Sequence, residues 1–212
     1  MKLFGYWRSS AAYRVRIALN LKKIDCELIS IHLVKDGGQQ HSQSYKELNP
    51  NELVPTLVDG EMSLNQSMAI LDYLEQKYPE VALLPKGLED NVKAKALAYD
   101  IACDIHPLNN LRVLSYISNE LNQEDAIKKQ WYQHWVVVGF KALEASLAKT
   151  KGLFCYGDEI SWADICLIPQ VYNAERFNVD MSQFPNIMEV TNRCRALPEF
   201  WAAAPEQQAD AT

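Results

Sequence analysis

The pattern of hydrophobic residues and turn signals changes near residue 80 and divides the chain into two parts. Before that point, short strand-like and helix-like segments alternate in the order β-α-β and then β-β-α. Asp59-Gly60 is a strong hairpin signal and joins the last two strands. The order predicts a small α/β domain over residues 1–80. The expected strands are residues 2–6, 26–31, 56–58 and 62–64, and the expected helices are residues 12–21 and 66–77.

After residue 80 the strand pattern disappears. Tyr78-Pro79 and Leu84-Pro85 are typical of connecting segments, and we expect a linker over residues 81–89. Long helical stretches follow, so the sequence predicts an all-helical domain over residues 90–212. The expected helices are residues 90–120 with a kink at Pro107, residues 123–149, one that opens at Ser161, and one from Pro185 to before Pro198.

The third of these helices carries a start signal of its own. Ser161 and Asp164 have the spacing of a capping box, with Asp164 in the place where Glu or Gln is usual. We interpret both residues as folding determinants and not as catalytic groups.

Composition narrows the classes of function. The net charge of −6 argues against a nucleic-acid binder, which normally presents a basic face. No apolar run approaches the ~20 residues of a membrane span, and the first residues lack the apolar core of a signal peptide. The five cysteines and four histidines show no metal-ligand spacing. Because scattered, odd-numbered cysteines are typical of reduced thiols, we expect a cytoplasmic protein. From the spacing, the apolar runs and the net charge we expect no metal, no membrane and no nucleic-acid partner.

The most informative segment begins at Arg8 and crosses from the first expected strand into the first expected helix. A helix N-terminus leaves backbone N–H groups unpaired and carries a partial positive charge, so it suits an anion. Serine is also an ordinary N-cap residue, and the simplest alternative is that Ser9 or Ser10 only caps the helix. The spacing alone does not decide between these interpretations.

Together with the rest of the chain, this segment resembles the zeta class of glutathione transferases, the family that includes maleylacetoacetate isomerases. The segment is Arg8-Ser9-Ser10-Ala11-Ala12-Tyr13-Arg14-Val15-Arg16-Ile17-Ala18-Leu19. Other matching segments of the first half are Lys35-Asp36-Gly37-Gly38-Gln39-Gln40, Leu48-Asn49-Pro50, Val54-Pro55-Thr56-Leu57 and Gln66-Ser67-Met68-Ala69-Ile70. Those of the second half are Pro107-Leu108-Asn109-Asn110-Leu111, Gly157-Asp158-Glu159, Ala163-Asp164-Ile165-Cys166-Leu167, Pro169-Gln170-Val171 and Asn173-Ala174-Glu175-Arg176-Phe177.

The resemblance implies a fold and a reaction. The fold is an N-terminal thioredoxin-like domain followed by an all-helical domain, and the family's dimers imply a homodimer. The reaction is the glutathione-dependent cis–trans isomerisation of maleylacetoacetate to fumarylacetoacetate in tyrosine and phenylalanine breakdown. A thiolate adds to the double bond, the resulting single bond rotates, and elimination follows, so that glutathione is a covalent cofactor that is regenerated.

The resemblance also implies a role for the residues of the first half. The Ser10 hydroxyl would donate a hydrogen bond to the glutathione sulfur and favour its thiolate. The peptide bond between Val54 and Pro55 would be cis, and the backbone of Val54 would pair with the cysteinyl part of glutathione. Gln66 and Ser67 would hold the γ-glutamyl carboxylate, and Gln40 would reach the glycyl end. Ser9 and the backbone through Arg14 would line the same pocket. The glutathione-lining residues implied in this way are Ser9, Ser10, Ala11, Ala12, Tyr13, Arg14, Gln40, Val54, Gln66, Ser67, His106, Asn110, Leu111 and Arg112.

The sequence departs from the family pattern at a few places. Ala11 replaces the signature cysteine, and Ala12 replaces the serine after it. His106 stands where glutamine is usual, and Arg112 stands where a small polar residue is common. For His106 and Arg112, a role as solvated or kink-filling residues remains an equal alternative to contact with glutathione.

A dioxo acid substrate of this kind is a dianion, which calls for cations in an acidic protein. Arg8 and Arg176 are the candidates for its carboxylates, because a guanidinium binds a carboxylate through two parallel hydrogen bonds. The alternative for Arg176 is a structural ion pair with Glu175 or another neighbour.

Two other functions stay open at this point. The same thiolate would serve a transferase that acts on α-halo acids or other electrophiles. A non-catalytic glutathione-binding module is the third alternative. The presence of Ser10, Gln66 and Ser67 argues against that module, which has no need of a complete glutathione site.

Overall fold

The computed structural model describes the chain from Met1 to Thr212 except for the side chain of Asp36. Its internal contacts divide the chain into two compact units. The first unit contains Met1–Leu83 together with Ala196–Thr212, and the second contains Leu84–Arg195. Each unit is described by itself.

A four-stranded sheet forms the centre of the first unit, in the order β2-β1-β3-β4. Strand β1 (Lys2–Gly5) pairs in parallel with β2 (Glu27–Ser30) and antiparallel with β3 (Thr56–Asp59). The parallel pair requires a crossover, which helix α1 supplies. Strand β4 (Met62–Asn65) returns antiparallel through the predicted turn, where Gly60 has a φ of 61°. The predicted β-α-β and β-β-α order is therefore confirmed, and the unit is thioredoxin-like.

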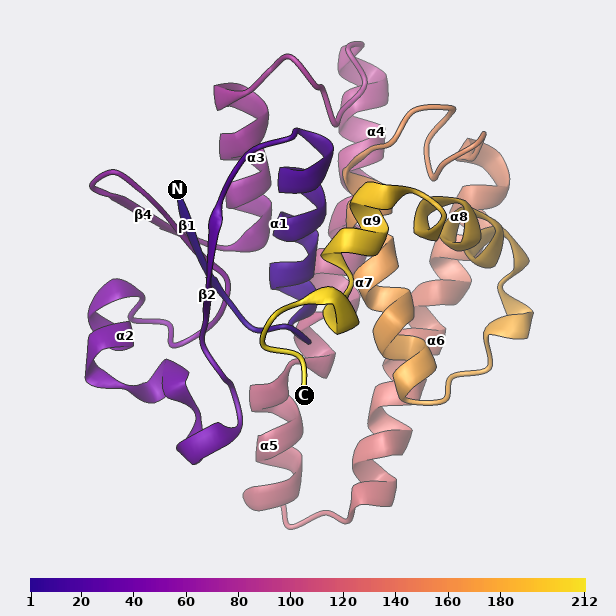
Figure 1. Cartoon of the computed structure of the whole chain (residues 1–212). Coiled ribbons are helices and arrows are strands. Elements are labelled where there is room, and N and C mark those ends of the chain that lie inside the picture. Colours follow the sequence, from indigo (N-terminus) through magenta and orange to yellow (C-terminus); the bar gives the residue numbers. More distant parts are fainter. The chain divides into compact units, whose positions relative to one another are not determined.

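Two helices cover one face of this sheet. Helix α1 (Ser10–Leu21) packs against α3 (Ser67–Lys77), and Figure 1 shows the two side by side next to the strands. Apolar side chains of both helices and of the sheet are almost completely buried. They include Leu3, Val15, Ile17, Leu57, Ile70 and Leu74. Burial of this kind is the main stabilising contribution to the unit.

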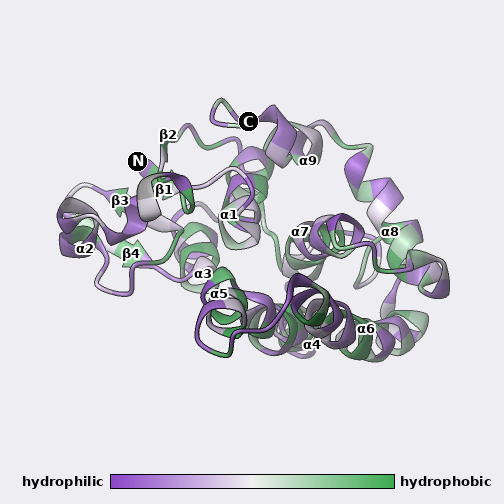
Figure 2. Ribbon diagram, turned by 90° about the horizontal axis from the view of Figure 1, so that it is seen from below, coloured by the Kyte–Doolittle hydropathy of each residue, from purple (hydrophilic) through white to green (hydrophobic). Residues whose placement is uncertain are grey.

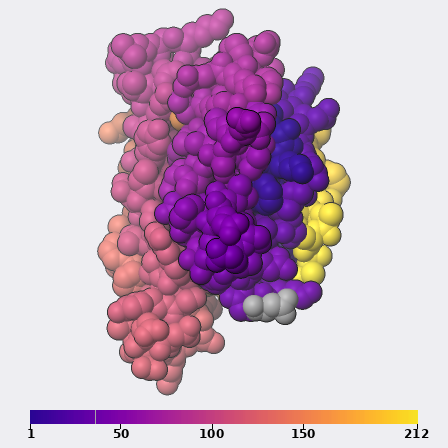
Figure 3. All heavy atoms as spheres, turned by 90° about the vertical axis from the view of Figure 1, so that its left-hand side faces the viewer, coloured from indigo at the N-terminus to yellow at the C-terminus, as the bar shows by residue number. Residues whose placement is uncertain are grey.

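The other side of the first unit carries a helix that the sequence did not predict. Helix α2 (Gln43–Leu48) is short and polar and buries only Tyr45. Such a segment has no apolar periodicity from which a helix could be inferred. Figure 3 shows this face of the unit, with α2 and the β3–β4 hairpin in purple.

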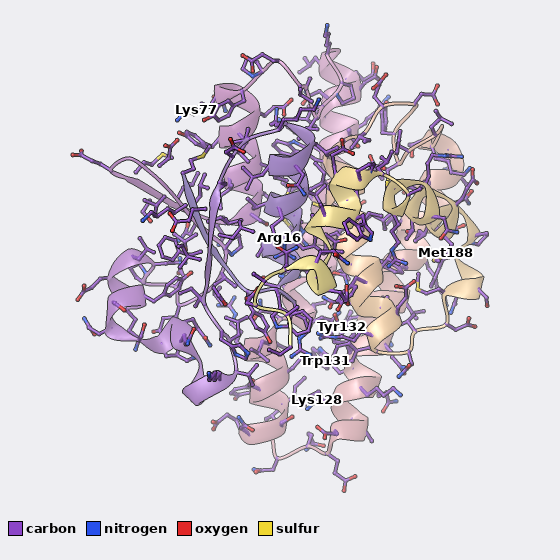
Figure 4. The ribbon with its side chains drawn as sticks, in the orientation of Figure 1. Arg16, Lys77, Lys128, Trp131, Tyr132 and Met188 are labelled. Atoms are coloured by element: carbon purple, nitrogen blue, oxygen red, sulfur yellow. The ribbon has the colours of Figure 1, made fainter. Side chains whose placement is uncertain are left out.

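The last residues of the chain differ from the prediction, which placed all of residues 90–212 in the helical domain. Helix α9 (Pro198–Ala203) instead packs against α1 of the first unit. Buried Arg16 connects them, because its guanidinium donates to Ala203 O at 3.0 Å and to Trp7 O at 2.9 Å. Figure 4 labels Arg16 at this place. The sequence predicted that a helix ends before Pro198, but it did not show against which part of the protein the following residues pack.

Helices make up the second unit. They are α4 (Leu88–Tyr99), α5 (Leu111–Asn119), α6 (Asp125–Thr150), α7 (Trp162–Arg176) and α8 (Pro185–Arg195). Hydrophobic and hydrophilic residues are interleaved along α4 and α6 (Figure 2), as expected for helices that bury one face. In α7, by contrast, all residues from 162 to 171 are buried. No helix in the described part of the chain combines the length and the apolar character that crossing a membrane requires.

The predicted single helix over residues 90–120 is interrupted more widely than a kink at Pro107. After α4, a π-helical turn runs over Asp100–Ile105, and a 3₁₀ turn covers Pro107–Asn109. The π turn brings Ile105 against α6, where Gly139 leaves room for it. A methyl group on Gly139 would overlap the Ile105 side chain. Tertiary packing against α6 thus accompanies a break that the sequence pattern located only at the proline.

Helix α7 begins with the predicted capping box. Asp164 is fully buried, and its carboxylate accepts hydrogen bonds from Ser161 N at 2.8 Å and from Cys155 N at 2.8 Å. The Ser161 hydroxyl donates to the same carboxylate at 3.0 Å. Burial is the largest influence on the pKa of Asp164 and raises it, while these hydrogen bonds lower it. These contacts support the interpretation of Ser161 and Asp164 as folding determinants.

Candidate active site

The N-terminus of α1 separates the roles of its two serines. Ser9 is the N-cap, and its hydroxyl accepts a hydrogen bond from Ala12 N at 3.2 Å. Ser10 is the first helical residue and is buried. No acidic residue lies in the first turn of α1. Capping therefore accounts for Ser9 but not for Ser10, whose hydroxyl lies at the positive end of a helix that lacks an internal anion.

The residues after Ser10 are closely packed. Ala11, Ala12 and Tyr13 are buried, and the Ala12 side chain lies next to Gly5 of β1. A Cβ atom on Gly5 would approach the Ala12 methyl group to 3.2 Å. The Ala12 side chain is therefore occupied by packing against β1, which leaves only its backbone for contact with a ligand.

Arg14 is the most unusual charged residue of the first unit. Its side chain is 2% exposed, and one guanidinium nitrogen, Nη1, donates to Ser67 Oγ at 3.3 Å. The other two, Nε and Nη2, are buried without a hydrogen-bond partner among the described residues. No carboxylate of the described part of the chain pairs with it. The sequence predicted a role only for the backbone at this position.

The N-terminus of α3 lies at the other end of this hydrogen bond. Ser67 is its first residue and is buried, and no acidic residue follows in the first turn. Gln66 precedes it in a left-handed conformation, with a φ of 68°, which is uncommon for a residue other than glycine. Its side chain makes no cap hydrogen bond. Backbone strain of this kind often marks functional sites.

Two further predicted residues of the first unit lie on loops. The peptide bond between Val54 and Pro55 is cis, as the resemblance implied. Gln40 is buried in a 3₁₀ turn (Gln39–His41) of the connection before α2, where its Nε2 contacts Leu33 O at 3.4 Å and His41 Nε2 at 3.0 Å. Its Oε1 atom has no partner among the described residues.

A hydrogen-bond network that the sequence did not reveal holds the loop before β3. Asn49 donates through Nδ2 to Leu53 O at 2.8 Å and to Thr56 Oγ1 at 3.1 Å. The Tyr45 hydroxyl also donates to Leu53 O, at 2.8 Å. Asn49 belongs to the matching segment Leu48-Asn49-Pro50, which is the only sequence signal that could have pointed to it.

Arg8 lies immediately before the two serines and is half-buried. Its guanidinium carbon lies 4.5 Å from the centroid of the Trp7 ring, and Nη2 donates to the Tyr6 hydroxyl at 3.1 Å. Its Nε is buried without a partner among the described residues, and no described carboxylate forms an ion pair with it. Stacking on an aromatic ring orients a guanidinium without neutralising its charge.

The remaining predicted residues belong to the second unit. Asn110 is the N-cap of α5, since its Oδ1 accepts a hydrogen bond from Arg112 N at 3.1 Å. Leu111 and Arg112 are exposed in the first turn of that helix. His106 lies between the π turn and the 3₁₀ turn. Asn110 therefore has a structural role that the sequence analysis did not consider.

Arg176 ends α7 and is exposed, with its guanidinium carbon 5.1 Å from the centroid of the Phe177 ring. The alternative for Arg176 was a structural ion pair with Glu175 or another neighbour. The structure shows Glu175 bound instead by Arg195, through hydrogen bonds of 2.9 and 2.6 Å. Glu175 is thus the partner of a different arginine.

Family models and a curated relative match this chain. Residues 3–82 match the model of the glutathione S-transferase N-terminal domain, and residues 111–198 match that of the C-terminal domain. A probable maleylacetoacetate isomerase of Vibrio cholerae is 53% identical over 209 residues, which cover 99% of this chain and 97% of the relative. The chain belongs to the glutathione S-transferase family.

Solved structures indicate to which class of this transferase family the chain belongs. The holo structure of a maleylpyruvate isomerase, described as a bacterial zeta-class glutathione S-transferase, superposes with a TM-score of 0.97 at 41% identity over the whole of both chains. A maleylacetoacetate isomerase of Methylobacterium extorquens, with bound malonate and glutathione, has a TM-score of 0.96 at 37% identity, also over both whole chains. The resemblance to the zeta class is therefore confirmed.

In the first unit the Arg14 side chain of α1 donates a hydrogen bond to Ser67, the first residue of α3. The sequence placed both residues at the glutathione site but did not predict this contact between their side chains. A buried arginine in an amphipathic stretch has the same pattern as an exposed one, because hydropathy gives only the face and not the depth of burial.

Proposed function

We propose that this chain catalyses the glutathione-dependent cis–trans isomerisation of maleylacetoacetate to fumarylacetoacetate. The observation that carries the proposal is the N-terminus of α1, where Ser10 is buried in a first turn without acidic residues and where Ser9 already supplies the cap. The identity of 53% to a probable maleylacetoacetate isomerase supports the choice of reaction.

The residues of the first unit fit glutathione. The tripeptide has a carboxylate at each end and a thiol between them. The N-terminus of α3 with Ser67 and the buried cation of Arg14 suit one carboxylate, and the buried amide of Gln40 suits the polar glycyl end. Bound glutathione supplies the thiolate that adds to the activated double bond and leaves after rotation.

Ser10 acts as a hydrogen-bond donor and not as a nucleophile. Its hydroxyl donates to the glutathione sulfur, and the partial positive charge of α1 favours the ionised form of the thiol. Ser9, Ala11, Ala12 and Tyr13 line the same place on the helix, and Val54 pairs with glutathione through its backbone.

Two arginines take the carboxylates of the substrate. Arg8 is oriented by the Trp7 ring and keeps a buried Nε without a partner among the described residues. Arg176 is exposed, and its neighbour Glu175 is occupied by Arg195. Both guanidinium groups are therefore available to bind the two carboxylates of the substrate. His106, Asn110, Leu111 and Arg112 are proposed as further residues that contact glutathione.

A second substrate has direct support. The structure with a TM-score of 0.97 is that of a maleylpyruvate isomerase, whose substrate by name is also a maleyl compound. The proposed residues do not distinguish two cis-dioxo acids that differ at the end remote from the double bond. A comparison of kcat/KM for the two compounds decides which one this enzyme prefers.

The experiment that tests the function is an ultraviolet measurement of initial isomerisation rates with and without glutathione. We expect a rate that requires glutathione and falls about 100-fold in Ser10→Ala, the usual cost of a donor to a developing or stabilised anion. Ser146→Ala, a serine-to-alanine change on α6, is the matched control and should keep the wild-type rate. Isomerisation no faster than with free glutathione contradicts the proposal, and α-halo acids are then the next substrates to assay.

The physiological setting belongs to the same proposal. The enzyme works in the cytoplasm, in tyrosine and phenylalanine breakdown, as a homodimer. Support for the dimer comes from α4, where Leu88, Val92 and Tyr99 are 82%, 51% and 40% exposed. At 100° per residue these side chains lie within about 40° of one another around the helix. An exposed apolar stripe of this kind is typical of an interaction surface.

Sedimentation equilibrium tests the dimer. The wild-type chain should sediment at twice its mass of 24.2 kDa. Val92→Glu should shift it toward the monomer, because a carboxylate at a buried interface loses its hydration. Val138→Glu, at an exposed valine on α6, is the control and should leave the mass unchanged. A wild-type monomer at micromolar concentration contradicts this part of the proposal.

A further inference from the structure

Buried charges are the most informative groups of the described structure. They are Arg14, Arg16, Lys22 and Asp164. Arg16 donates to backbone carbonyls, and Lys22 donates to the carbonyls of Tyr78 and Val81 and pairs with Glu75 at 2.8 Å. Asp164 accepts the hydrogen bonds of its capping box. Arg14 is the exception, since its one hydrogen bond given by the structure goes to Ser67.

The lack of a counter-charge for Arg14 lowers the stability of the ligand-free protein. An arginine does not escape burial by losing its proton, and an uncompensated buried charge is strongly destabilising. Arg14 keeps its Nε and Nη2 buried and unsatisfied among the described residues. A fold that tolerates such a cation is expected to gain its counter-charge from outside the chain.

The position of Ser67 shows where that counter-charge belongs. Its Oγ accepts from Arg14 Nη1, which leaves the hydroxyl proton available for a different acceptor. Ser67 also begins α3, so the partial positive charge of the helix acts at the same place. A hydroxyl donor, a helix N-terminus and a buried guanidinium together favour a carboxylate.

We infer that Arg14 is a positioning residue for glutathione: it orients the Ser67 hydroxyl as a donor and supplies the buried positive charge that balances the γ-glutamyl α-carboxylate. The inference rests on the proposed binding of glutathione and adds a role that contact residues alone do not have. At 2% exposure Arg14 acts through Ser67 and not by direct contact. Its action is on binding, so it should affect the affinity for glutathione and leave the chemical step unchanged.

Isothermal titration calorimetry tests the inference with two ligands. The first is glutathione, and the second is 4-aminobutanoyl-Cys-Gly, which lacks only the γ-glutamyl α-carboxylate. Glutathione should bind Arg14→Met about 10-fold more weakly than it binds the wild type, in keeping with the loss of a charge-assisted interaction. The truncated ligand should bind both proteins equally. In Arg14→Lys, which keeps the charge, part of the affinity for glutathione should return.

A structural role for Arg14 gives a different result. Met has a similar length, so replacing an unsatisfied buried charge should leave the urea midpoint of the ligand-free protein unchanged or raise it. The KM for glutathione should rise in Arg14→Met while kcat at saturating glutathione stays near wild type. Ser67→Ala should weaken glutathione binding, and adding Arg14→Met to it should weaken binding little further.

The outcomes separate the inference from the function on which it rests. If the wild type does not bind glutathione, the proposed function fails. If the wild type binds and Arg14→Met weakens both ligands equally, or neither, the inference is overturned. If Arg14→Met does not fold, the comparison of the two ligands is made on Arg14→Lys, where a loss of affinity that is equal for both ligands overturns it.

Discussion

Helices α7 and α1 both begin with a serine N-cap, but they differ in the charge of their first turn. Helix α7 has Ser161 as its N-cap and Asp164 as its third residue, and α1 has Ser9 as its N-cap and Ala12 as its third residue. In α7 the chain supplies its own carboxylate, which the Ser161 and Cys155 N–H groups and the Ser161 hydroxyl all bind. In α1 the first turn contains no acidic residue.

The first turn of a helix thus distinguishes a structural N-terminus from one that binds a ligand. A closed N-terminus, whose donors are bound by the chain itself, contributes to stability and has no capacity left for an external anion. An open N-terminus has no carboxylate of its own in the first turn and keeps its dipole, with the donors that no cap binds, for a ligand. Helix α3 is open in the same sense, with no side-chain cap at Gln66 and with Arg14 buried beside Ser67.

The largest effect is expected where the closed helix is opened. Asp164→Ala leaves the backbone N–H groups of Cys155 and Ser161 buried without an acceptor, and it removes the capping box. We expect a loss of about 3 kcal/mol in the free energy of unfolding, since each buried orphan donor costs about 1–3 kcal/mol. Urea denaturation followed by circular dichroism measures it.

Asp164→Asn is the companion variant, because it keeps the shape and one acceptor oxygen. It should lose less stability than Asp164→Ala and should bind glutathione like the wild type once folded. A loss below about 1 kcal/mol in Asp164→Ala would mean that the closed N-terminus of α7 matters little to the fold.

The sequence predicted the contacts at the N-terminus of the closed helix but not the Arg14–Ser67 contact at the N-terminus of α3, for a physical reason. A capping box is a local pattern, and both of its members, Ser161 and Asp164, are visible within a few residues. The same locality explains why the strands of the first unit and the turn at Asp59-Gly60 were predicted correctly. Local hydrogen bonding and periodicity determine these elements.

The features that the sequence did not predict depend on contacts between distant segments. Arg14 and Ser67 are far apart in the chain, and only the folded unit shows that they share a hydrogen bond. The place of α9 on α1 depends on Arg16 reaching Ala203. The width of the break after α4 accompanies the packing of Ile105 against Gly139. The resemblance to the zeta class implied Ser10 and Ser67 as binding residues, but a signature does not show which side chains are left unsatisfied.

A smaller effect is expected when an open helix is closed. Ala69 is exposed and is the third residue of α3 after the N-cap position, which is the place that Asp164 occupies in α7. Ala69→Glu puts a carboxylate at the N-terminus that is proposed to hold the γ-glutamyl carboxylate. The two negative charges compete for the same donors and the same dipole. We expect glutathione to bind about 3-fold more weakly, which corresponds to the 0.3–1 kcal/mol typical of a charge at a helix end.

The control is Ala69→Gln, which has nearly the same shape without the charge and should bind glutathione like the wild type. Calorimetry at low and high salt strengthens the comparison, because the difference between Glu and Gln should shrink as salt screens the exposed charge. Ala69→Glu should also unfold at a slightly higher urea concentration without ligand, since the added carboxylate favours the helix. If both variants bind glutathione equally, the N-terminus of α3 does not act on the ligand through its charge. The contrast between the open and the closed helices would then hold for α1 alone.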